Sequence, residues 1–240
     1  MTVRAPSVVE NLAAVRDRIA QAAHAAGRSA AEVRLVAVSK TRPPEAIAAA
    51  LAAGQFDFGE NRIDEALPKR AALAASGARW HMIGHIQSRQ AREVAAADFA
   101  LVHSVDTLKL AERLSRAAVA AGRRVPILLE CNVSGESAKS GFRALTPADW
   151  DALRPAVAQL LALPALDVRG LMTMAPIVAS PSAARPIFER LRLLRDWLAA
   201  AWPAAGWAEL SMGMSDDFEA AIAEGATLVR VGRAIFGERG

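Results

Sequence analysis

Eight short β-rich runs alternate with amphipathic helical stretches along this 240-residue chain. Such alternation is typical of strand–helix units built around a parallel sheet. Eight units in about this length favour a closed (β/α)8 barrel over an open doubly wound sheet. The runs cover residues 34–39, 56–60, 80–84, 101–105, 127–132, 168–174, 209–212 and 228–231.

Helix start and stop signals fit the same plan. An extra helix over residues 8–26 precedes the first strand, a helix over 43–53 begins with proline, and one over 106–121 ends at Gly122. The Pro/Ser-rich segment 175–181 could divide the chain, but it also falls where the loop after the sixth strand belongs. We therefore predict a single barrel domain over residues 1–240.

Polar residues follow the predicted strands at their carboxyl ends. In a barrel of this kind the functional face lies at those ends. We therefore expect these polar residues to share one mouth of the barrel. The residues, in chain order, are Ser39-Lys40, Glu60-Asn61, His85 and Gln87, Ser104 and Asp106, Asn132 to Glu136, Thr173, Ser211 to Ser215, and Gly232-Arg233.

Lys40 is unusual because the chain otherwise avoids lysine. Lys40, Lys69, Lys109 and Lys139 are its four lysines, against twenty-five arginines. A lysine amine can lose its proton and attack a carbonyl as a Schiff-base nucleophile, which a guanidinium cannot do. The position therefore indicates covalent chemistry. The alternative is a lysine that snorkels from a strand end.

Charge and cysteine content narrow the class of protein. The net charge is +4, but the arginines are interleaved with acids, and no basic block with aromatics indicates nucleic-acid binding. The amphipathic N-terminal segment lacks the features of a secretory signal, and no stretch is long and apolar enough for a membrane span. The single cysteine, Cys131, excludes an intrachain disulfide framework, so we expect a cytoplasmic protein.

The last two predicted strands are followed by a candidate phosphate site. Small residues let backbone N–H groups approach an oxyanion, and Ser211 or Ser215 can add a hydroxyl donor. Gly232-Arg233 opens a short helical segment at the place where barrels commonly bind phosphate. Ordinary loop glycines are the alternative for this segment.

A Schiff-base lysine and a phosphate site together fit pyridoxal 5′-phosphate. Arg230 lies two residues before Gly232 on the same strand face, so it can point inward and hydrogen-bond the pyridine nitrogen. A permanent cation there disfavours protonation of that nitrogen and weakens the ring as an electron sink. A salt bridge to a phosphate or carboxylate is the other reading of Arg230.

His81 and His85 lie four residues apart in one strand-like run, so alternation places both on one face. With no acidic or cysteine ligand nearby in sequence, we expect packing or hydrogen bonding from them, and no metal site. Cys131 ends an apolar strand and reads as a core residue.

The residues also resemble a known family, the pyridoxal phosphate homeostasis proteins, over nearly the full chain. The resemblance rests on ordered segments from every part of the barrel. They are Val36 to Thr41, Phe58 to Asn61, Trp80 to Gln87, His103 to Asp106, Asn132 to Glu136, Lys139 to Phe142, Gly170 to Met174, Leu210 to Asp217 and Val229 to Gly237.

This resemblance implies a barrel like the N-terminal domain of alanine racemase and other fold-type III pyridoxal enzymes. It implies pyridoxal phosphate bound covalently to Lys40 as an internal aldimine, with Arg230 near the ring nitrogen and Asn61 beside the ring. It places Ser211, Gly232 and Arg233 at the phosphate.

Two segments depart from the family pattern. After Gln87-Ser88 the family tends to have Asn-Lys, whereas this chain has Arg89-Gln90. Asp64 stands where a glutamine is expected. A role for that lysine as a second cation therefore does not carry over, while the core of the phosphate site is unaffected.

The resemblance implies a carrier or regulator of intracellular pyridoxal phosphate and linked amino-acid pools, with no catalytic residues. Apoenzymes that use the cofactor are its expected recipients, and we expect a monomer. A racemase of this barrel type pairs its lysine with a tyrosine from a second domain, and this chain has no tyrosine. A pyridoxal-dependent racemase and a Schiff-base aldolase are the alternative functions.

Overall fold

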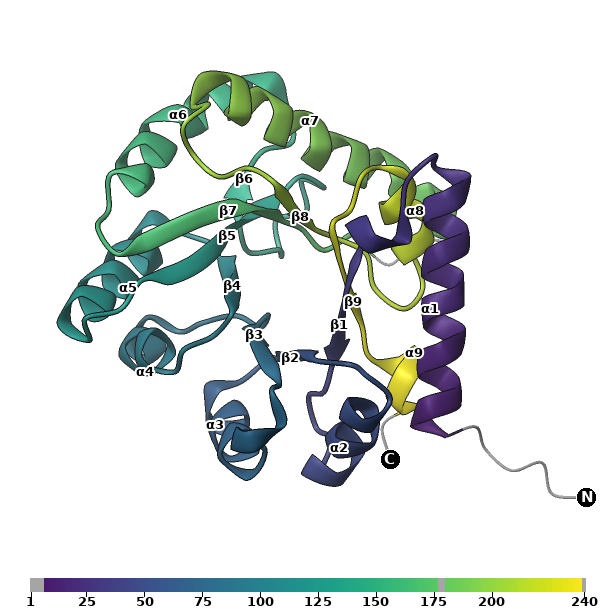
Figure 1. The fold of residues 1–240 in the computed structure, drawn as a ribbon. Helices are drawn as coiled ribbons and strands as arrows, with labels where there is room; N and C mark the ends of the chain where they lie inside the picture. Colours follow the sequence, from purple (N-terminus) through teal and green to yellow (C-terminus); the bar gives the residue numbers. More distant parts are fainter. Residues whose placement is uncertain (1–6, 177–179, 239–240) are drawn as a thin grey trace, which may run out of the picture.

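The predicted strands form a closed parallel barrel in the computed structural model, which describes residues 7–176 and 180–238 (Figure 1). Every strand pairing in these ranges is parallel, and pairing between the first and last strands of the order below closes the ring. The predicted (β/α)8 barrel is confirmed. The order is β4 (Leu101–Val105), β3 (Arg79–Met82), β2 (Asp57–Glu60), β1 (Arg34–Val38), β9 (Leu228–Val231), β8 (Glu209–Ser211), β7 (Leu166–Met172) and β5 (Val125–Asn132).

The predicted strand bounds agree closely with the observed ones. The ranges 101–105 and 228–231 coincide with β4 and β9, and the other six differ from their strands by one or two residues at one or both ends. The structure adds one short strand, β6 (Phe142–Arg143), which pairs with the end of β5. Two residues are too few to give an alternating pattern, so the sequence did not predict β6.

Helices surround the barrel, and each strand-to-strand crossover passes over its outer surface (Figure 1). The predicted helix over 43–53 corresponds to the second helix of the structure and the one over 106–121 to the fifth, each shorter by one or two residues at its ends. The helices are α1 (Val8–Ala25), α2 (Pro44–Ala52), α3 (Ile63–Ala72), α4 (Ala91–Ala96), α5 (Leu108–Ala120), α6 (Pro147–Leu161), α7 (Arg185–Ala201), α8 (Phe218–Ala223) and α9 (Arg233–Phe236).

The extra N-terminal helix α1 packs beside α8 and α9 (Figure 1). It begins with a capping box, in which Ser7 and Glu10 satisfy each other's backbone N–H groups. Its buried residues recur every three or four positions, as an amphipathic helix requires. The Asn11 side chain donates a hydrogen bond to the Ile235 carbonyl in α9 (3.0 Å), which ties α1 to the carboxyl mouth of the barrel.

The barrel interior is apolar at one level and polar at the next. The polar level, nearer the carboxyl ends of the strands, includes Arg230 and Glu130. The apolar level is a separate cluster of five buried side chains from five strands, Val36, Leu101, Leu128, Met172 and Leu228.

The candidate domain boundary at 175–181 includes residues 177–179, which lie outside the described residues. The single domain over residues 1–240 therefore stays a prediction. Within the described parts of the chain, each helix is too short or too polar to cross a bilayer.

Candidate functional site

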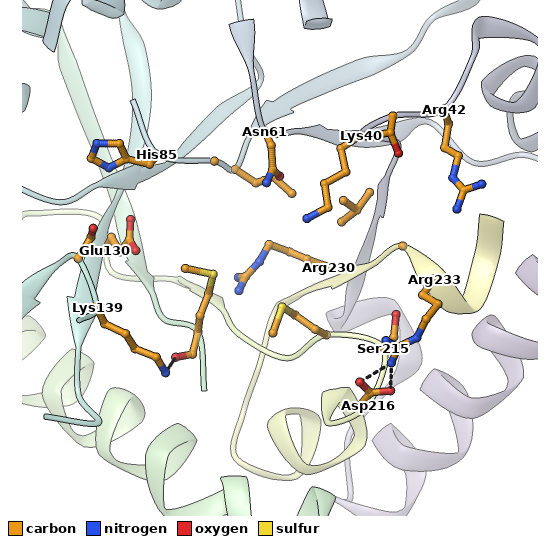
Figure 2. Close-up of a pocket in the computed structure, with 18 of the residues that line it drawn as sticks. Lys40, Arg42, Asn61, His85, Glu130, Lys139, Ser215, Asp216, Arg230 and Arg233 are labelled. Carbon is orange, nitrogen blue, oxygen red and sulfur yellow. Dashed lines mark hydrogen bonds and ion pairs between the residues drawn. The ribbon is translucent and has the colours of Figure 1, made fainter. Parts of the chain in front are cut away.

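A pocket of about 670 Å³ opens at the carboxyl ends of the barrel strands. Figure 2 shows the Lys40 side chain extending into it near Arg230, with Arg42, Arg233, Ser215 and Asp216 on one side and His85, Glu130 and Lys139 on the other. The remaining lining residues are Val38, Thr41, Asn61, Ile83, Gly84, Ala138, Ser140, Met174, Met214, Gly232, Gly237 and Glu238.

Lys40 follows β1 by two residues and sits in a tightly turned segment. The Ser39 N–H donates to the Gly59 carbonyl of β2, and the Arg42 N–H donates back to the Ser39 carbonyl (both 3.0 Å). Thr41 has a φ of 63°, a left-handed conformation that is costly for a branched side chain. The chain therefore turns sharply at the residue that presents the amine.

A second lysine holds the backbone on both sides of Lys40. Lys69 of α3 is buried, and its ammonium donates to the Ser39 carbonyl at 2.7 Å. It also pairs with Glu60 at 2.8 Å and with Glu65 at 2.6 Å. Glu65 in turn accepts the Thr41 N–H.

Glu60 completes this ionic group from the end of β2. It accepts the Ser39 hydroxyl hydrogen bond at 2.6 Å, while its second oxygen, Oε2, is buried with no hydrogen-bond partner among the described residues. Burial raises the pKa of Glu60, although Lys69 and Ser39 counteract the shift. Buried Lys69 and Glu60, together with the partly exposed Glu65, thus form a charge cluster that fixes the turn carrying Lys40.

Arg230 is buried in the floor of the pocket, on β9. Its guanidinium donates to the Ser211 hydroxyl at 2.5 Å and to the Thr173 carbonyl at 2.9 Å. Burial lowers the pKa of Arg230 to about 10, against the attraction of Glu130 and Asp217, so the group stays charged at neutral pH. The predicted inward position of Arg230 is confirmed.

One side of the pocket gathers groups suited to an anion. Arg233 ion-pairs with Asp216 and is half-exposed, so its charge is accessible from the pocket. Ser215 accepts the Ala234 N–H at 3.4 Å, and a Cβ placed on Gly232 would lie 3.2 Å from the Val38 backbone oxygen. Backbone N–H groups of small residues, a hydroxyl and a guanidinium are the donors that phosphate sites use.

The opposite side carries acidic groups. Glu130 of β5 is buried and its carboxylate lines the pocket. Burial and the nearby Asp106 raise the pKa of Glu130 to about 7, while Arg230 and His85 oppose the shift. His85 pairs with Asp106 at 3.1 Å, and Lys139 pairs with Glu136 at 2.7 Å.

The structure brings together five of the six predicted site residues: Lys40, Asn61, Arg230, Gly232 and Arg233 all line the pocket. Ser211 does not line it. Its hydroxyl is fully buried beneath the pocket, engaged by Arg230 and by His103. The alternative hydroxyl considered from the sequence, Ser215, lies in the pocket wall.

One expectation about the histidines was wrong. His81 and His85 do not share a face, because β3 ends at Met82 and His85 belongs to the loop beyond it. His81 is buried inside the barrel, whereas His85 is exposed at the mouth. In residues 7–176 and 180–238 no group of three or more His, Cys, Asp or Glu side chains could hold a metal ion.

Sequence reasoning also missed several pocket residues, among them Arg42, Glu130 and Lys139. The position of Glu130 could have been predicted from the sequence, because it is an acid within a predicted apolar strand. It lies two residues before Asn132, the last residue of that strand, and so on the same strand face. Burial makes the pKa of Cys131 higher than usual, in keeping with its expected role in the core.

Comparison with known proteins agrees with the family resemblance seen in the sequence. The family model for the N-terminal domain of alanine racemase matches residues 11–240. A pyridoxal phosphate homeostasis protein from Pseudomonas aeruginosa is 50% identical over 234 residues, which cover 97% of this chain and 96% of the relative. The chain belongs to the pyridoxal phosphate homeostasis protein family.

Solved structures agree with this family assignment. The structure of PipY from Synechococcus elongatus with pyridoxal phosphate bound is 38% identical, has a TM-score of 0.81, and covers 96% of this chain and 100% of PipY. Alanine racemase from Streptomyces coelicolor is 24% identical, with a TM-score of 0.66, and covers 95% of this chain and 59% of the racemase. At that identity the racemase shows the shared barrel fold alone.

Proposed function

We propose that this homeostasis-family protein binds pyridoxal 5′-phosphate in the mouth of its barrel and carries or buffers it through a reversible Schiff base to Lys40. The observation that carries the proposal is one pocket that contains an accessible lysine amine, an anion-binding side and a buried guanidinium. The proposal also takes support from PipY, a family relative solved with the cofactor bound.

The residues of the pocket fit this cofactor. Arg233, Ser215 and the backbone around Gly232 supply donors for the phosphate, and Lys40 reaches the pocket from the neighbouring strand. Arg230 offers a donor that can face the ring nitrogen, and Asn61, which lines the same pocket, would lie beside the ring. We keep Ser211 as a member of this group through Arg230, since its hydroxyl supports that guanidinium.

Lys40 would hold the cofactor through its amine, because condensation of an amine with the cofactor's aldehyde releases water and is reversed by hydrolysis.

Arg230 favours the carrier over a catalyst. A guanidinium beside the ring nitrogen would disfavour protonation of that nitrogen, and the ring would then be a weaker electron sink. The chain also has no tyrosine to serve as the second base of a racemase. We therefore propose a cofactor-binding regulator without physiological turnover.

A spectral titration tests this proposal. Purified protein is mixed with pyridoxal phosphate, and the visible absorption of the Schiff base is followed for the wild type and for Lys40→Ala. We expect a saturable band in the wild type and none in the variant. A wild-type protein that develops no band, or a band that survives Lys40→Ala, would overturn the proposal.

Racemisation and transamination assays on the loaded protein separate carrier from enzyme. We expect no turnover with common amino acids beyond that of free pyridoxal phosphate. Turnover at roughly 1 s⁻¹ or faster, which is within the ordinary range for enzymes, would contradict the carrier assignment.

A further inference from the structure

Five polar side chains form a single-file hydrogen-bond chain through the interior of the barrel. Asp57 is 3.0 Å from Nε2 of His81, and Nδ1 of His81 is 3.0 Å from Nε2 of His103. Nδ1 of His103 is 2.8 Å from the Ser211 hydroxyl, which Arg230 contacts at 2.5 Å. All five residues are at least nine-tenths buried.

The chain of hydrogen bonds connects opposite walls of the barrel. Asp57, His81 and His103 lie on the neighbouring strands β2, β3 and β4, whereas Ser211 and Arg230 lie on β8 and β9. Because β5 and β7 separate β4 from β8 in the strand order, the contact between His103 and Ser211 spans the interior. The chain starts beside Arg79, which pairs with Asp57, and ends at the pocket floor.

The two ends of the chain fix where its protons lie. Arg230 can only donate hydrogen bonds, and an ionised Asp57 can only accept them. Burial raises the pKa of Asp57, but the bonds from Arg79 and His81 outweigh it and hold the pKa well below its usual range. His81 therefore carries its proton on Nε2 and accepts at Nδ1, which requires a proton on Nε2 of His103.

The same logic continues to Arg230. With its proton on Nε2, neutral His103 accepts at Nδ1, so Ser211 donates its hydroxyl proton there and accepts from Arg230. Burial, together with the charge of Arg230, holds the pKa of His103 well below its usual value, which keeps the ring neutral. A charged His81 would instead donate from Nδ1 to His103, and His103 would then have to donate to Ser211. The Ser211 hydroxyl proton would be left without an acceptor among these five residues.

We propose that Ser211, His103, His81 and Asp57 are positioning residues that hold Arg230 through a hydrogen-bond relay running in one direction, from Arg230 to Asp57. The Thr173 carbonyl fixes a second guanidinium nitrogen. These two contacts leave the remaining N–H groups of Arg230 for the pocket. Arg230 has no directly bonded acid among the described residues, and the nearby Glu130 and Asp217 supply the attraction that favours its charge.

Histidine tautomers test the relay without any cofactor. Nitrogen-15 chemical shifts of labelled apoprotein near neutral pH report which ring nitrogen is protonated. We expect His81 and His103 both neutral, with the proton on Nε2 and Nδ1 free of hydrogen. A cationic ring, or a proton on Nδ1 of either histidine, would overturn the proposed direction.

Ser211→Ala tests what the relay does for the pocket. The variant removes the hydroxyl that links His103 to Arg230. The test rests on the proposed function, in which Arg230 contacts the bound cofactor. We expect pyridoxal phosphate to bind about tenfold more weakly or worse, with a shifted absorption maximum of the bound cofactor. The same substitution should also release His103 from a single tautomer.

Ser115→Ala is the matched control. Ser115 is also buried, but it lies on the outer helix α5, where its hydroxyl donates to the Pro164 carbonyl (2.5 Å). We expect it to leave affinity and spectrum unchanged. Equal affinity and spectrum in Ser211→Ala and Ser115→Ala would contradict the relay. Failure of the wild type to bind the cofactor would instead refute the proposed function, while the tautomer measurement would still decide the relay.

Discussion

Two lysines in neighbouring elements have opposite environments. Lys69 is buried among two carboxylates and a carbonyl oxygen, whereas Lys40 reaches a solvent-accessible pocket. A buried ammonium with three oxygen partners is suited to a structural role, because moving it away would leave its carboxylate partners without their counter-ion. Lys69 therefore supports the turn that presents Lys40, and the reactive amine and its support come from different residues.

Lys69→Met should destabilise the protein strongly. The substitution leaves the Glu60 carboxylate buried with the Ser39 hydroxyl as its remaining hydrogen-bond donor among the described residues, and removal of one member of a buried ion pair costs on the order of 3 kcal/mol. Urea unfolding of the apoprotein measures the change. Lys109→Met, at an exposed position of α5, is the control and should stay close to the wild type.

A double variant isolates the charge effect. Glu60→Gln in the Lys69→Met background removes the uncompensated carboxylate, so we expect it to recover part of the lost free energy of unfolding. If the double variant is less stable than Lys69→Met alone, the unpaired charge is not the source of the loss.

Glu130 should make stability depend on pH. Its pKa is about 7 in the folded protein and near 4.5 in the unfolded chain, so the folded state binds more protons between these values. The free energy of unfolding contributed by this group therefore falls as pH rises from about 4.5 to about 7.

Glu130→Gln removes that titration. We expect the variant to be more stable than the wild type at about pH 8, by on the order of 1–3 kcal/mol, and to lose this advantage near pH 4.5. Thermal or urea unfolding at both pH values measures the difference. An equal difference at the two pH values would show that Glu130 does not titrate in this range.

At the scale of elements, the loops after β2 and β3 touch at the pocket wall. A Cβ placed on Gly84 would lie 2.2 Å from the Asn61 carbonyl oxygen, so the two loops can approach only because residue 84 is glycine. Gly84→Ala should push Asn61 outward, weaken pyridoxal phosphate binding and cost about 1–3 kcal/mol of stability. Calorimetric binding and urea unfolding measure the two effects.

Gly27→Ala provides the comparison. Gly27 has a φ of 68°, and a Cβ placed on it would meet no atom within 4 Å, so alanine there strains the backbone without a clash. This variant should lose stability but bind the cofactor normally. Normal binding by Gly84→Ala as well would show that the Asn61 loop does not shape the pocket.

The sequence predicted the elements better than their contacts. All eight barrel strands and the N-terminal helix were predicted within two residues, because alternation and helix caps are local signals. The shared face of His81 and His85 was wrong because it depended on where β3 ends. Ser211 was expected at the phosphate, but its hydroxyl bonds Arg230 on the paired strand β9 and His103 on β4 across the barrel, and no local spacing reveals such contacts.

At the scale of the whole molecule, the pocket depends on ring closure. Lys40 and Arg230 come from opposite ends of the sequence and become neighbours through the pairing of β1 with β9. The relay from Arg230 to Asp57 likewise needs the complete ring. Strand-end polarity located the mouth, but only the closed barrel brings its residues together.

A single domain over residues 1–240 should unfold in one cooperative step. We expect far-ultraviolet circular dichroism and tryptophan fluorescence to give the same urea midpoint, since the tryptophans lie both in β3 and around α6 and α7. Different midpoints would indicate two folding units. Sedimentation of the same sample tests the expected monomer.

The most direct test of Lys40 as the cofactor-bearing residue is chemical. The loaded protein is reduced with borohydride, which converts the Schiff base to a stable amine, and is then digested and analysed by mass spectrometry. We predict that the pyridoxyl label lies on Lys40. A label found on Lys139 or Lys109 instead, or no label on any peptide of a protein that binds the cofactor, would contradict the account.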